Sequence, residues 1–428
     1  MTRLYQLMTE PQFSRCSKPS KYKKLLFALC FFHSVLLERR KFLQLGWNIV
    51  CGFNDSDFEV SENLLSLYLD EYEETPWDAL KYLIAGVNYG GHVTDDWDRR
   101  LLTTYINDYF CEQALSTPSY RLSVLETYFI PKDGSLASYK EYISMLPGMD
   151  PPETFGQHPN ADVACQITEA HTLFETLLSL QPQITPTRAG DQSREEKVLE
   201  LAADVKQKIP EMIDYEGTRK LLAMDPSPLN VVLLQEIQRY NKLLETILFS
   251  LTDLEKGIQG LTVMSTSLEE AYPSQKPLAS WTRDLAMRVE QFELWASRTR
   301  PPVIFWLSGF TFPTGFLTAV LQSSARQNND GVWVRGLYLE GAGWDRKNSC
   351  LVEAEPMQLV CLMPTIHFRP TESRKKSAKG VYSCPCYYYP NRAGSSDRAS
   401  FVIGIDLRSG TMTSDHWIKR GTALLMSR

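Results

Sequence analysis

The chain has 428 residues, of which 43% are hydrophobic and 22% charged, a balance that is typical of folded globular domains and excludes a disordered chain. Its formal net charge of -6 argues against nucleic acid as a partner, because binding phosphates requires a basic surface. The cysteines follow no dense pattern and suit buried thiols in a reducing compartment. The length predicts two or three domains.

The first segment of the chain predicts helices. Its most apolar run, residues 25–37, is too short to span a bilayer and contains His33 and Ser34. We therefore expect a soluble, intracellular protein without membrane contact, and a mostly buried helix over about 18–45. A second helix is expected from about Ser61.

Residues 76–100 predict two further helices. Thr75 and Pro76 suit the start of the first, and Gly90-Gly91 forms a turn after it. The second restarts at Thr94, where three acidic residues face the positive end of its dipole. The sequence 54–57 resembles a calcium loop but lacks its glycine and distal glutamate, so a turn with a helix cap is the better interpretation.

The middle of the chain predicts a linker and then a helical bundle. Turn signals crowd residues 116–162, although several tyrosines suggest that this linker is pinned to the surface. Helices resume after Pro159, residues 183–192 predict a loop, and Ser193 and Glu196 form a capping box. Apolar residues from Leu233 to Ile258 then alternate spacings of four and three. This seam favours an intramolecular bundle, with a coiled coil as the alternative.

After Pro301 the pattern changes to strands. A helix is expected over 313–327, and the short segments VWVRGLYLE, QLVCLMP, VYSCPCYYY and SFVIGIDL predict an antiparallel sheet or small barrel.

No catalytic or metal-binding motif can be assembled from the sequence. It contains no Gly-Lys dipeptide, which excludes a Walker A loop, and neither HExxH nor GxSxG. Cys384 and Cys386 could face one ion, but a zinc site needs two more ligands, and buried thiols are the favoured interpretation. The only additional candidates are isolated: Cys350, Cys361, His367 and His416. The basic run 374–379 is interpreted as a solvated loop rather than as a surface for an acidic partner.

Residues 76–100 resemble the lid of the sixth AAA+ module of dynein heavy chains, through their Pro-Trp, Tyr-Gly-Gly, Val-Thr-Asp and Asp-x-Arg groups. The stretches 155–162, 302–322, 336–345 and 416–425 are similar to successive parts of the dynein C-terminus. Together they cover nearly the whole chain in order, and their residues are most similar to those of inner-arm axonemal heavy chains.

The resemblance implies an α+β fold, mostly α, in which a helical AAA+ lid is followed by a helical bundle and a small antiparallel β-barrel. The implied division is a lid at 1–113, a linker at 114–158, and a C-terminal domain with a helical part at 159–300 and a barrel part at 301–428.

The function implied by the resemblance is structural and regulatory. ATP and magnesium would be bound by upstream modules of a minus-end-directed microtubule motor of cilia and flagella, and this chain would bind no cofactor. Implied partners are the other AAA+ modules of the ring and, through the complex, dynein intermediate and light chains and microtubules. The cytoplasm, the cytoskeleton and the axoneme are the implied locations. Residues expected to pack or to contact the ring are Trp77, Tyr89, Gly90, Gly91, Asp95, Arg99, Trp306, Gly309, Phe310, Glu340, Gly341, Trp417, Arg420 and Gly421.

Two joins depart from the family pattern. Family members carry further residues after Glu270 and, in a strand-like segment, after Asn329, whereas here Ala271 and Asp330 follow directly. The second join should remove a strand and leave a neighbouring strand with unpaired backbone groups, so the barrel is expected to be incomplete. A free-standing helical adaptor that docks through the 233–258 seam is the alternative function.

Overall fold

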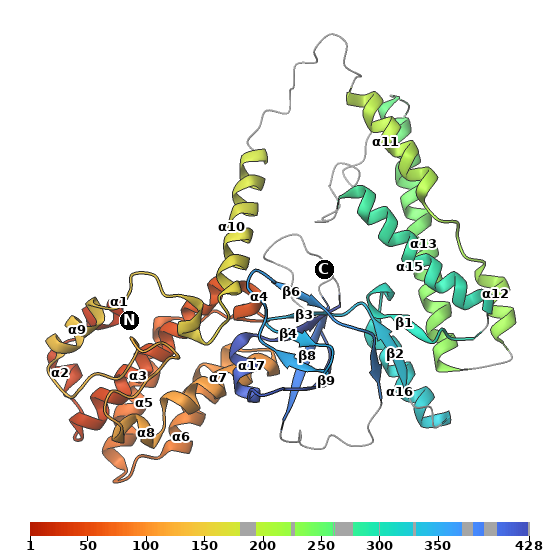
Figure 1. Ribbon diagram of the computed structural model, residues 1–428. Coiled ribbons are helices and arrows are strands. Elements are labelled where there is room, and N and C mark those ends of the chain that lie inside the picture. The colour runs from red at the N-terminus through yellow and green to blue at the C-terminus, as the bar shows by residue number, and fades with distance from the viewer. Residues whose placement is uncertain are drawn as a thin grey trace.

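The structure is a computed structural model that describes residues 1–179, 194–223, 227–259, 261, 277–298, 300–327, 331–369, 380–388 and 400–426. N-terminal helices form one side of the molecule, small sheets lie in the centre, and a second group of helices stands on the other side (Figure 1). The prediction of an α+β, mostly α fold is confirmed.

The N-terminal helices surround α3, which is buried on almost its whole circumference. It ends at Glu38, before the predicted end near residue 45, because Arg39 turns into the core and begins a short 3-10 turn. The next long helix starts earlier than predicted, because the Asn54 side chain accepts hydrogen bonds from the backbone of Ser56 and Asp57. The elements here are α1 (Thr2–Leu7), α2 (Glu10–Phe13), α3 (Pro19–Glu38), η1 (Arg39–Phe42), α4 (Leu43–Gly46), α5 (Asp55–Glu71), α6 (Trp77–Lys81), η2 (Tyr82–Asn88), η3 (Gly90–His92), α7 (Asp96–Tyr109) and α8 (Glu112–Ser116).

The segment that follows packs against the N-terminal core. It contains α9 (Leu136–Ser144) and η4 (Pro152–Phe155). The fully buried ring of Tyr139 lies 5.1 Å from that of Phe13, and the Tyr142 hydroxyl donates to the Thr127 carbonyl over 2.7 Å. These contacts agree with the expectation of a pinned segment.

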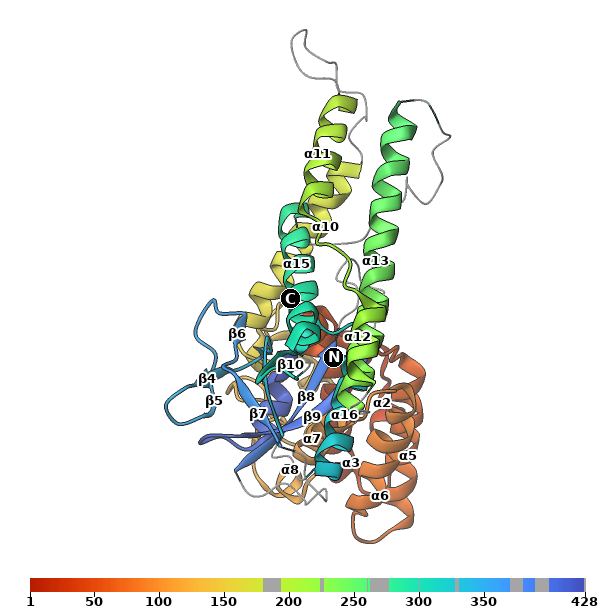
Figure 2. The same cartoon turned by 90° about the vertical axis from the view of Figure 1, so that its right-hand side faces the viewer.

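The second helical group contains the predicted bundle. Its helices are α11 (Arg194–Lys208), α12 (Tyr215–Leu222), α13 (Pro228–Ile258), α15 (Leu278–Arg298) and α16 (Pro313–Gln327). The helix α10 (Asn160–Ser179) stands apart from this group in Figure 1 and contacts η1 on the N-terminal side. The first half of the predicted seam, from Leu233 to Leu244, is buried where α13 packs on α11, α12, α15 and α16. The intramolecular interpretation of the seam is therefore confirmed for this half. Figure 2 shows α11 and α13 standing upright above the sheets.

The strands form three sheets, and among the described residues none closes into a barrel. A five-stranded sheet has the order β6-β3-β10-β8-β9, a three-stranded sheet has the order β1-β2-β7, and β4 pairs with β5. The expectation of purely antiparallel pairing is wrong, since β1–β2 and β10–β8 are parallel. The α16 crossover between β1 and β2 accounts for the first case, because it returns the chain to the same end of the sheet. The strands are β1 (Ile304–Trp306), β2 (Val332–Arg335), β3 (Tyr338–Glu340), β4 (Gly343–Asp345), β5 (Cys350–Val352), β6 (Val360–Leu362), β7 (Ile366–Phe368), β8 (Val381–Tyr388), β9 (Ser400–Arg408) and β10 (Ala423–Leu425).

The helix α17 (Ser414–Arg420) packs the C-terminal segment against the N-terminal helices. It lies between β9 and β10 in the sequence and packs on both α7 and β8. The N-terminal helices and the C-terminal segment therefore share one interface (Figure 1).

Several predictions fall outside the described residues. They are the loop at 183–192, the cap residue Ser193, the basic run 374–379, and the joins at 270–271 and 329–330.

Candidate functional site: the interface between the N-terminal helices and the C-terminal segment

The stretch 76–100 contains a turn of π-helix that the sequence did not reveal. The helix α6 continues into η2, and the Tyr89 amide donates to the Ile84 carbonyl five residues back over 3.0 Å. A Cβ atom on Gly90 would lie 2.7 Å from the Ala85 carbonyl oxygen, so this position requires glycine. Gly91 has open space around it.

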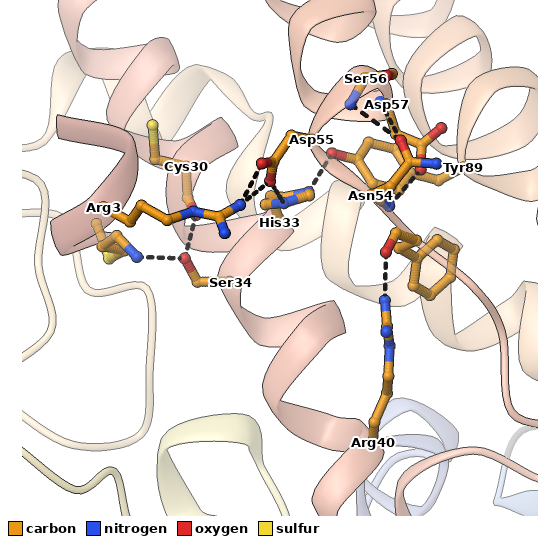
Figure 3. Close-up of polar contacts among 12 residues, drawn as sticks. Arg3, Cys30, His33, Ser34, Arg40, Asn54, Asp55, Ser56, Asp57 and Tyr89 are labelled. Carbon is orange, nitrogen blue, oxygen red and sulfur yellow. Dashed lines mark hydrogen bonds and ion pairs between the residues drawn. The ribbon is translucent and has the colours of Figure 1, made fainter. Parts of the chain in front are cut away.

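The wider turn leaves Tyr89 fully buried, where its hydroxyl lies 2.8 Å from Nδ1 of His33 on α3. Figure 3 shows His33 between Tyr89 and Asp55, whose carboxylate is held by Arg3. Burial lowers the pKa of His33 to about 4, so the imidazole is neutral near pH 7. Tyr89 thus has a packing role that ties η2 to the central helix.

Two buried carboxylates mark the beginning of α7. Asp95 accepts a hydrogen bond from the Tyr387 hydroxyl on β8 over 2.7 Å. Asp98 accepts from the backbone amides of Asn48 and Ile49 over 3.1 and 3.0 Å. Burial raises the pKa of Asp98 to about 7 in spite of these donors. Asp95 therefore connects α7 to the sheet, and Asp98 connects α7 to the loop after α4.

Arg100 crosses the interface, whereas the predicted residue Arg99 does not. Arg100 donates to the Ser383 carbonyl over 2.8 Å and to the Tyr382 hydroxyl over 2.7 Å, and its guanidinium lies 4.5 Å from the centre of the Trp97 ring. Arg99 is exposed and contacts only its own neighbourhood. A helical pattern could have separated the two, because Trp97 and Arg100 are three residues apart and share a face.

Arg39 is the central polar residue of the interface, and sequence reasoning missed it. Its side chain is 0% exposed and donates to five oxygens of four separate segments. The acceptors are the Gly46 carbonyl at 3.1 Å, the Leu45 carbonyl at 3.1 Å, the Tyr105 hydroxyl at 2.8 Å, the Phe155 carbonyl at 3.2 Å and the Lys419 carbonyl at 3.0 Å. No sequence signal marked it, since it belongs to a run of four charged residues that is typical of an exposed helix end.

The C-terminal side of the interface is α17. Its Trp417 is fully buried and donates from Nε1 to the Ser409 carbonyl over 3.0 Å. Gly421 ends the helix with a φ of 71°, and a Cβ atom there would lie 2.3 Å from the Leu45 carbonyl oxygen. This position therefore requires glycine both for its backbone conformation and for its close approach to α4.

Glu353 and Gly341 contact the end of α17 from the sheet side. A hydrogen bond from His416, together with Arg420 at 3.2 Å, lowers the pKa of Glu353 to about 2. Gly341, with a φ of 73°, comes so close that a Cβ atom would lie 2.9 Å from the Arg420 carbonyl oxygen. Glu340, the residue before it, pairs with Ala423 of β10 and Val360 of β6.

The remaining predicted residues lie elsewhere. The Trp306 amide donates to the Gln291 side chain over 2.7 Å, the Gly309 carbonyl accepts from the Tyr240 hydroxyl over 2.6 Å, and the Phe310 ring stacks on Phe316 at 4.2 Å. These three attach the bundle to the three-stranded sheet. Trp77 is half-buried and donates to the Glu112 side chain over 3.1 Å.

One small pocket lies at the interface. A pocket between Arg39, Asp98, Arg100 and Tyr382 has a volume of about 20 Å³, room for about one water molecule. In the described part of the chain, no three acidic, histidine or cysteine side chains are placed to share a metal ion, and no helix is long and apolar enough to cross a membrane. The thiols of Cys384 and Cys386 are buried in β8, and burial raises the pKa of Cys386 to about 12. The geometry is that of a packed, hydrogen-bonded joint.

Comparison with protein families matches the two sides of this joint to two domains of one family. Residues 22–161 match the AAA lid domain of dynein heavy chains. Residues 167–329 and 327–426 match the C-terminal domain of dynein heavy chains in two pieces. The two pieces meet at 327–329, which is next to the second predicted join.

Individual relatives agree with this assignment. The chain is 85% identical to dynein axonemal heavy chain 2 of Homo sapiens and 84% identical to that of Mus musculus, in both cases over its whole length. It is 49% identical, also over its whole length, to the dynein-1-beta heavy chain of the flagellar inner arm I1 complex of Chlamydomonas reinhardtii.

The chain spans about a tenth of the length of these relatives, namely 11%, 10% and 10%. The alignment with the human relative runs over 468 positions, 40 more than the 428 residues of the chain, so the relative carries residues that are absent here. The family matches cover almost all of the sequence, and the chain therefore belongs to the dynein heavy chain family.

Proposed function

We propose that this chain is a non-catalytic structural part of an axonemal dynein heavy chain, in which it fixes the AAA lid to the C-terminal domain. The observation that carries the proposal is Arg39, which hydrogen-bonds the lid helices α4 and α7, the connecting segment at Phe155 and the C-terminal helix α17. A joint that is held by one buried cation resists sliding, because each acceptor would lose its donor if the parts moved.

The relatives support a place in the axoneme. Two are axonemal heavy chains, and the algal protein belongs to a flagellar inner arm complex. We infer that this chain acts within the ATP-driven, minus-end-directed microtubule motor of cilia and flagella. Its direct partners would be the other AAA+ modules of the ring, and dynein intermediate and light chains and microtubules would be reached through the complex. Neither nucleic acid nor a membrane is a proposed partner.

Catalysis is assigned to other modules of the motor. The sequence has no Walker A loop, and ATP and magnesium would be bound by modules outside the matched lid and C-terminal domains. The proposed contribution of this chain is the shape and rigidity of the joint, with no cofactor of its own.

The experiment has two parts. The purified chain should not hydrolyse ATP above the level of a mock purification, and an epitope-tagged chain expressed in ciliated cells should be recovered in isolated axonemes. The variant Arg39→Met should lose this recovery, whereas the exposed Arg99→Met should keep it. ATP turnover that follows the chain through purification, or a tagged chain that is recovered only outside axonemes, would contradict the proposal.

The adaptor function has less support. The docking seam that it requires is buried at Leu233, Ile237, Tyr240 and Leu244 by helices of the same chain.

A further inference from the structure

One face of the three-stranded sheet β1-β2-β7, here called the outer face, carries aromatic and basic side chains and no acidic one among its described positions. Figure 1 shows β1 and β2 on the side of the sheets that is turned away from the N-terminal helices. We propose that the outer face is a docking surface for an extended acidic segment of another protein, in which two carboxylates four residues apart flank one apolar side chain. The residues of this face are Ile304, Trp306, Trp333, Arg335, His367 and Arg369.

Alternation along the strands separates the outer face from the core. On β2, Val332 and Val334 are buried. Trp333 and Arg335 alternate with them and are exposed, Trp333 by 44%. On β1, Ile304 is 45% exposed and pairs with Trp333 in the register of the two strands. Two large apolar side chains are therefore exposed next to each other.

A row across the sheet gives the outer face its apolar centre. The register pairs Trp333 with Ile304 on one side and with His367 on the other. The rings of Trp333 and His367 stack, with 4.6 Å between their centres and 19° between their planes. Tryptophan and arginine are enriched among the residues that contribute most to binding in protein interfaces. The row is therefore suited to one apolar side chain of a partner.

Two arginines flank this row. Arg335 lies two residues beyond Trp333 on β2. On the other side of Trp333, the register of β2 and β7 continues to place Arg369 opposite Gly331. A Cβ atom on Gly331 would lie 3.1 Å from the Cα atom of Arg369, which agrees with this pairing. The two arginines are thus four positions apart along the strand, a span of about 13 Å at about 3.3 Å per residue.

Both arginines are available to a carboxylate. Within the described part of the chain, Arg335 forms no ion pair, and Arg369 donates from Nε to Nδ1 of His367 over 3.1 Å. The sign of this face is opposite to the net charge of the chain, which is -6. In an extended segment, side chains two and four residues apart point the same way. Carboxylates four residues apart would therefore meet both arginines and place the side chain between them on Trp333.

Single-stranded nucleic acid is the other class of ligand that stacks on aromatic side chains and binds arginine. The observations favour a protein segment, because affinity for nucleic acid comes from many phosphate contacts. The described positions of the outer face offer two guanidinium groups, on a chain whose net charge repels a polyanion. An oligonucleotide is therefore one arm of the test.

The test uses the full-length 428-residue protein and the fluorescein-labelled peptide Gly-Ser-Glu-Ser-Phe-Ser-Glu-Ser-Gly, with binding followed by fluorescence anisotropy. Binding should saturate, and it should weaken as sodium chloride is added, because the arginines are exposed. Trp333→Ala should raise the Kd about tenfold, and Arg335→Gln and Arg369→Gln about threefold each. Arg346→Gln, which changes an exposed arginine in the turn between β4 and β5, should bind as the parent protein does.

A charge exchange makes the test independent of Trp333. The double variant with Arg335→Glu and Arg369→Glu should reject the acidic peptide and bind the peptide in which lysines replace both glutamates, whereas the parent protein should do the reverse. The proposal is overturned if the parent protein does not bind the acidic peptide, if Arg346→Gln weakens binding as much as Arg335→Gln does, or if a peptide with adjacent glutamates binds equally well.

The remaining outcomes identify a different occupant. Tighter binding of an oligothymidylate than of the acidic peptide would overturn the proposal in favour of nucleic acid. Sedimentation that shows a dimer of the parent protein, and a monomer of the Trp333→Ala variant, would overturn it in favour of a second copy of this chain.

Discussion

Replacing Arg39 with methionine is the sharpest test of the joint. Methionine approximates the length of the side chain but removes all five donor contacts. Three of the five acceptors keep another hydrogen bond in the variant. The Leu45 carbonyl still accepts from Gln157 over 2.8 Å, and the Tyr105 hydroxyl still donates to the Phe155 carbonyl. The Gly46 and Lys419 carbonyls lose the donor that Arg39 supplies.

The expected magnitude follows from these two carbonyls. Each buried acceptor that is left without a donor costs about 1–3 kcal/mol, which gives a loss of about 2–6 kcal/mol. Removing the buried guanidinium offsets part of this loss of stability, because the cost of desolvating the cation disappears with it. We expect the free energy of unfolding to fall by about 3 kcal/mol, a large share of the stability of a typical domain.

Urea unfolding followed by tryptophan fluorescence measures this change, with Arg99→Met as the matched control. Arg99 is exposed, so its variant should lie within about 0.5 kcal/mol of the parent protein. Arg39→Lys should also be destabilised, because one ammonium group cannot reach acceptors on four segments. If Arg39→Met unfolds at the same urea concentration as Arg99→Met, the joint does not depend on Arg39 and the reasoning fails.

Two further predictions concern α17. Gly421→Ala should lower the free energy of unfolding by more than about 1 kcal/mol, because φ at this position is 71° and the new Cβ atom would meet the Leu45 carbonyl. Gly91→Ala should be nearly neutral, because Gly91 has open space around it. Thermal unfolding of the two variants compares them, and equal midpoint temperatures would refute the steric account. The folded state lowers the pKa of Glu353 from 4.5 to about 2, so its hydrogen bond with His416 and its ion pair with Arg420 stabilise the protein above about pH 4.5, and this contribution is lost as the pH falls toward about 2. Urea midpoints of Glu353→Gln and the parent protein should therefore converge on acidification, and a constant difference would count against the pair.

The sequence predicted the helices well, because their apolar spacing is a local property. The bundle around Leu233–Leu244 follows from that spacing, and the cap at Asn54 follows from residue type. The end of α3 was misplaced, because periodicity cannot show that Arg39 turns inward to acceptors more than a hundred residues away. The π-helical turn before Tyr89 was also invisible, since no residue type encodes it.

The sheets and the joint were predicted less completely. Short β-rich segments do not specify which strand pairs with which, and the parallel pair β1–β2 depends on the path of α16. Tyr89, Asp95 and Gly421 were named from resemblance, and the structure places all three in packed positions, whereas a role in contacting the ring stays a prediction. Arg39 was missed because a buried arginine and an exposed one look alike in a charged run, and Arg100 was missed although it shares a helix face with Trp97.

The bond between Arg39 and Lys419 joins residues that are 380 positions apart. At a synthesis rate of about 5–20 residues per second, the ribosome needs about 20–80 seconds to add the residues between them. Throughout that time the lid helices exist without α17, and the Arg39 guanidinium lacks one of its acceptors. Nascent lid segments are thus exposed to premature aggregation until the last helix emerges, and chaperones that act during translation would have their greatest effect on this part of the protein.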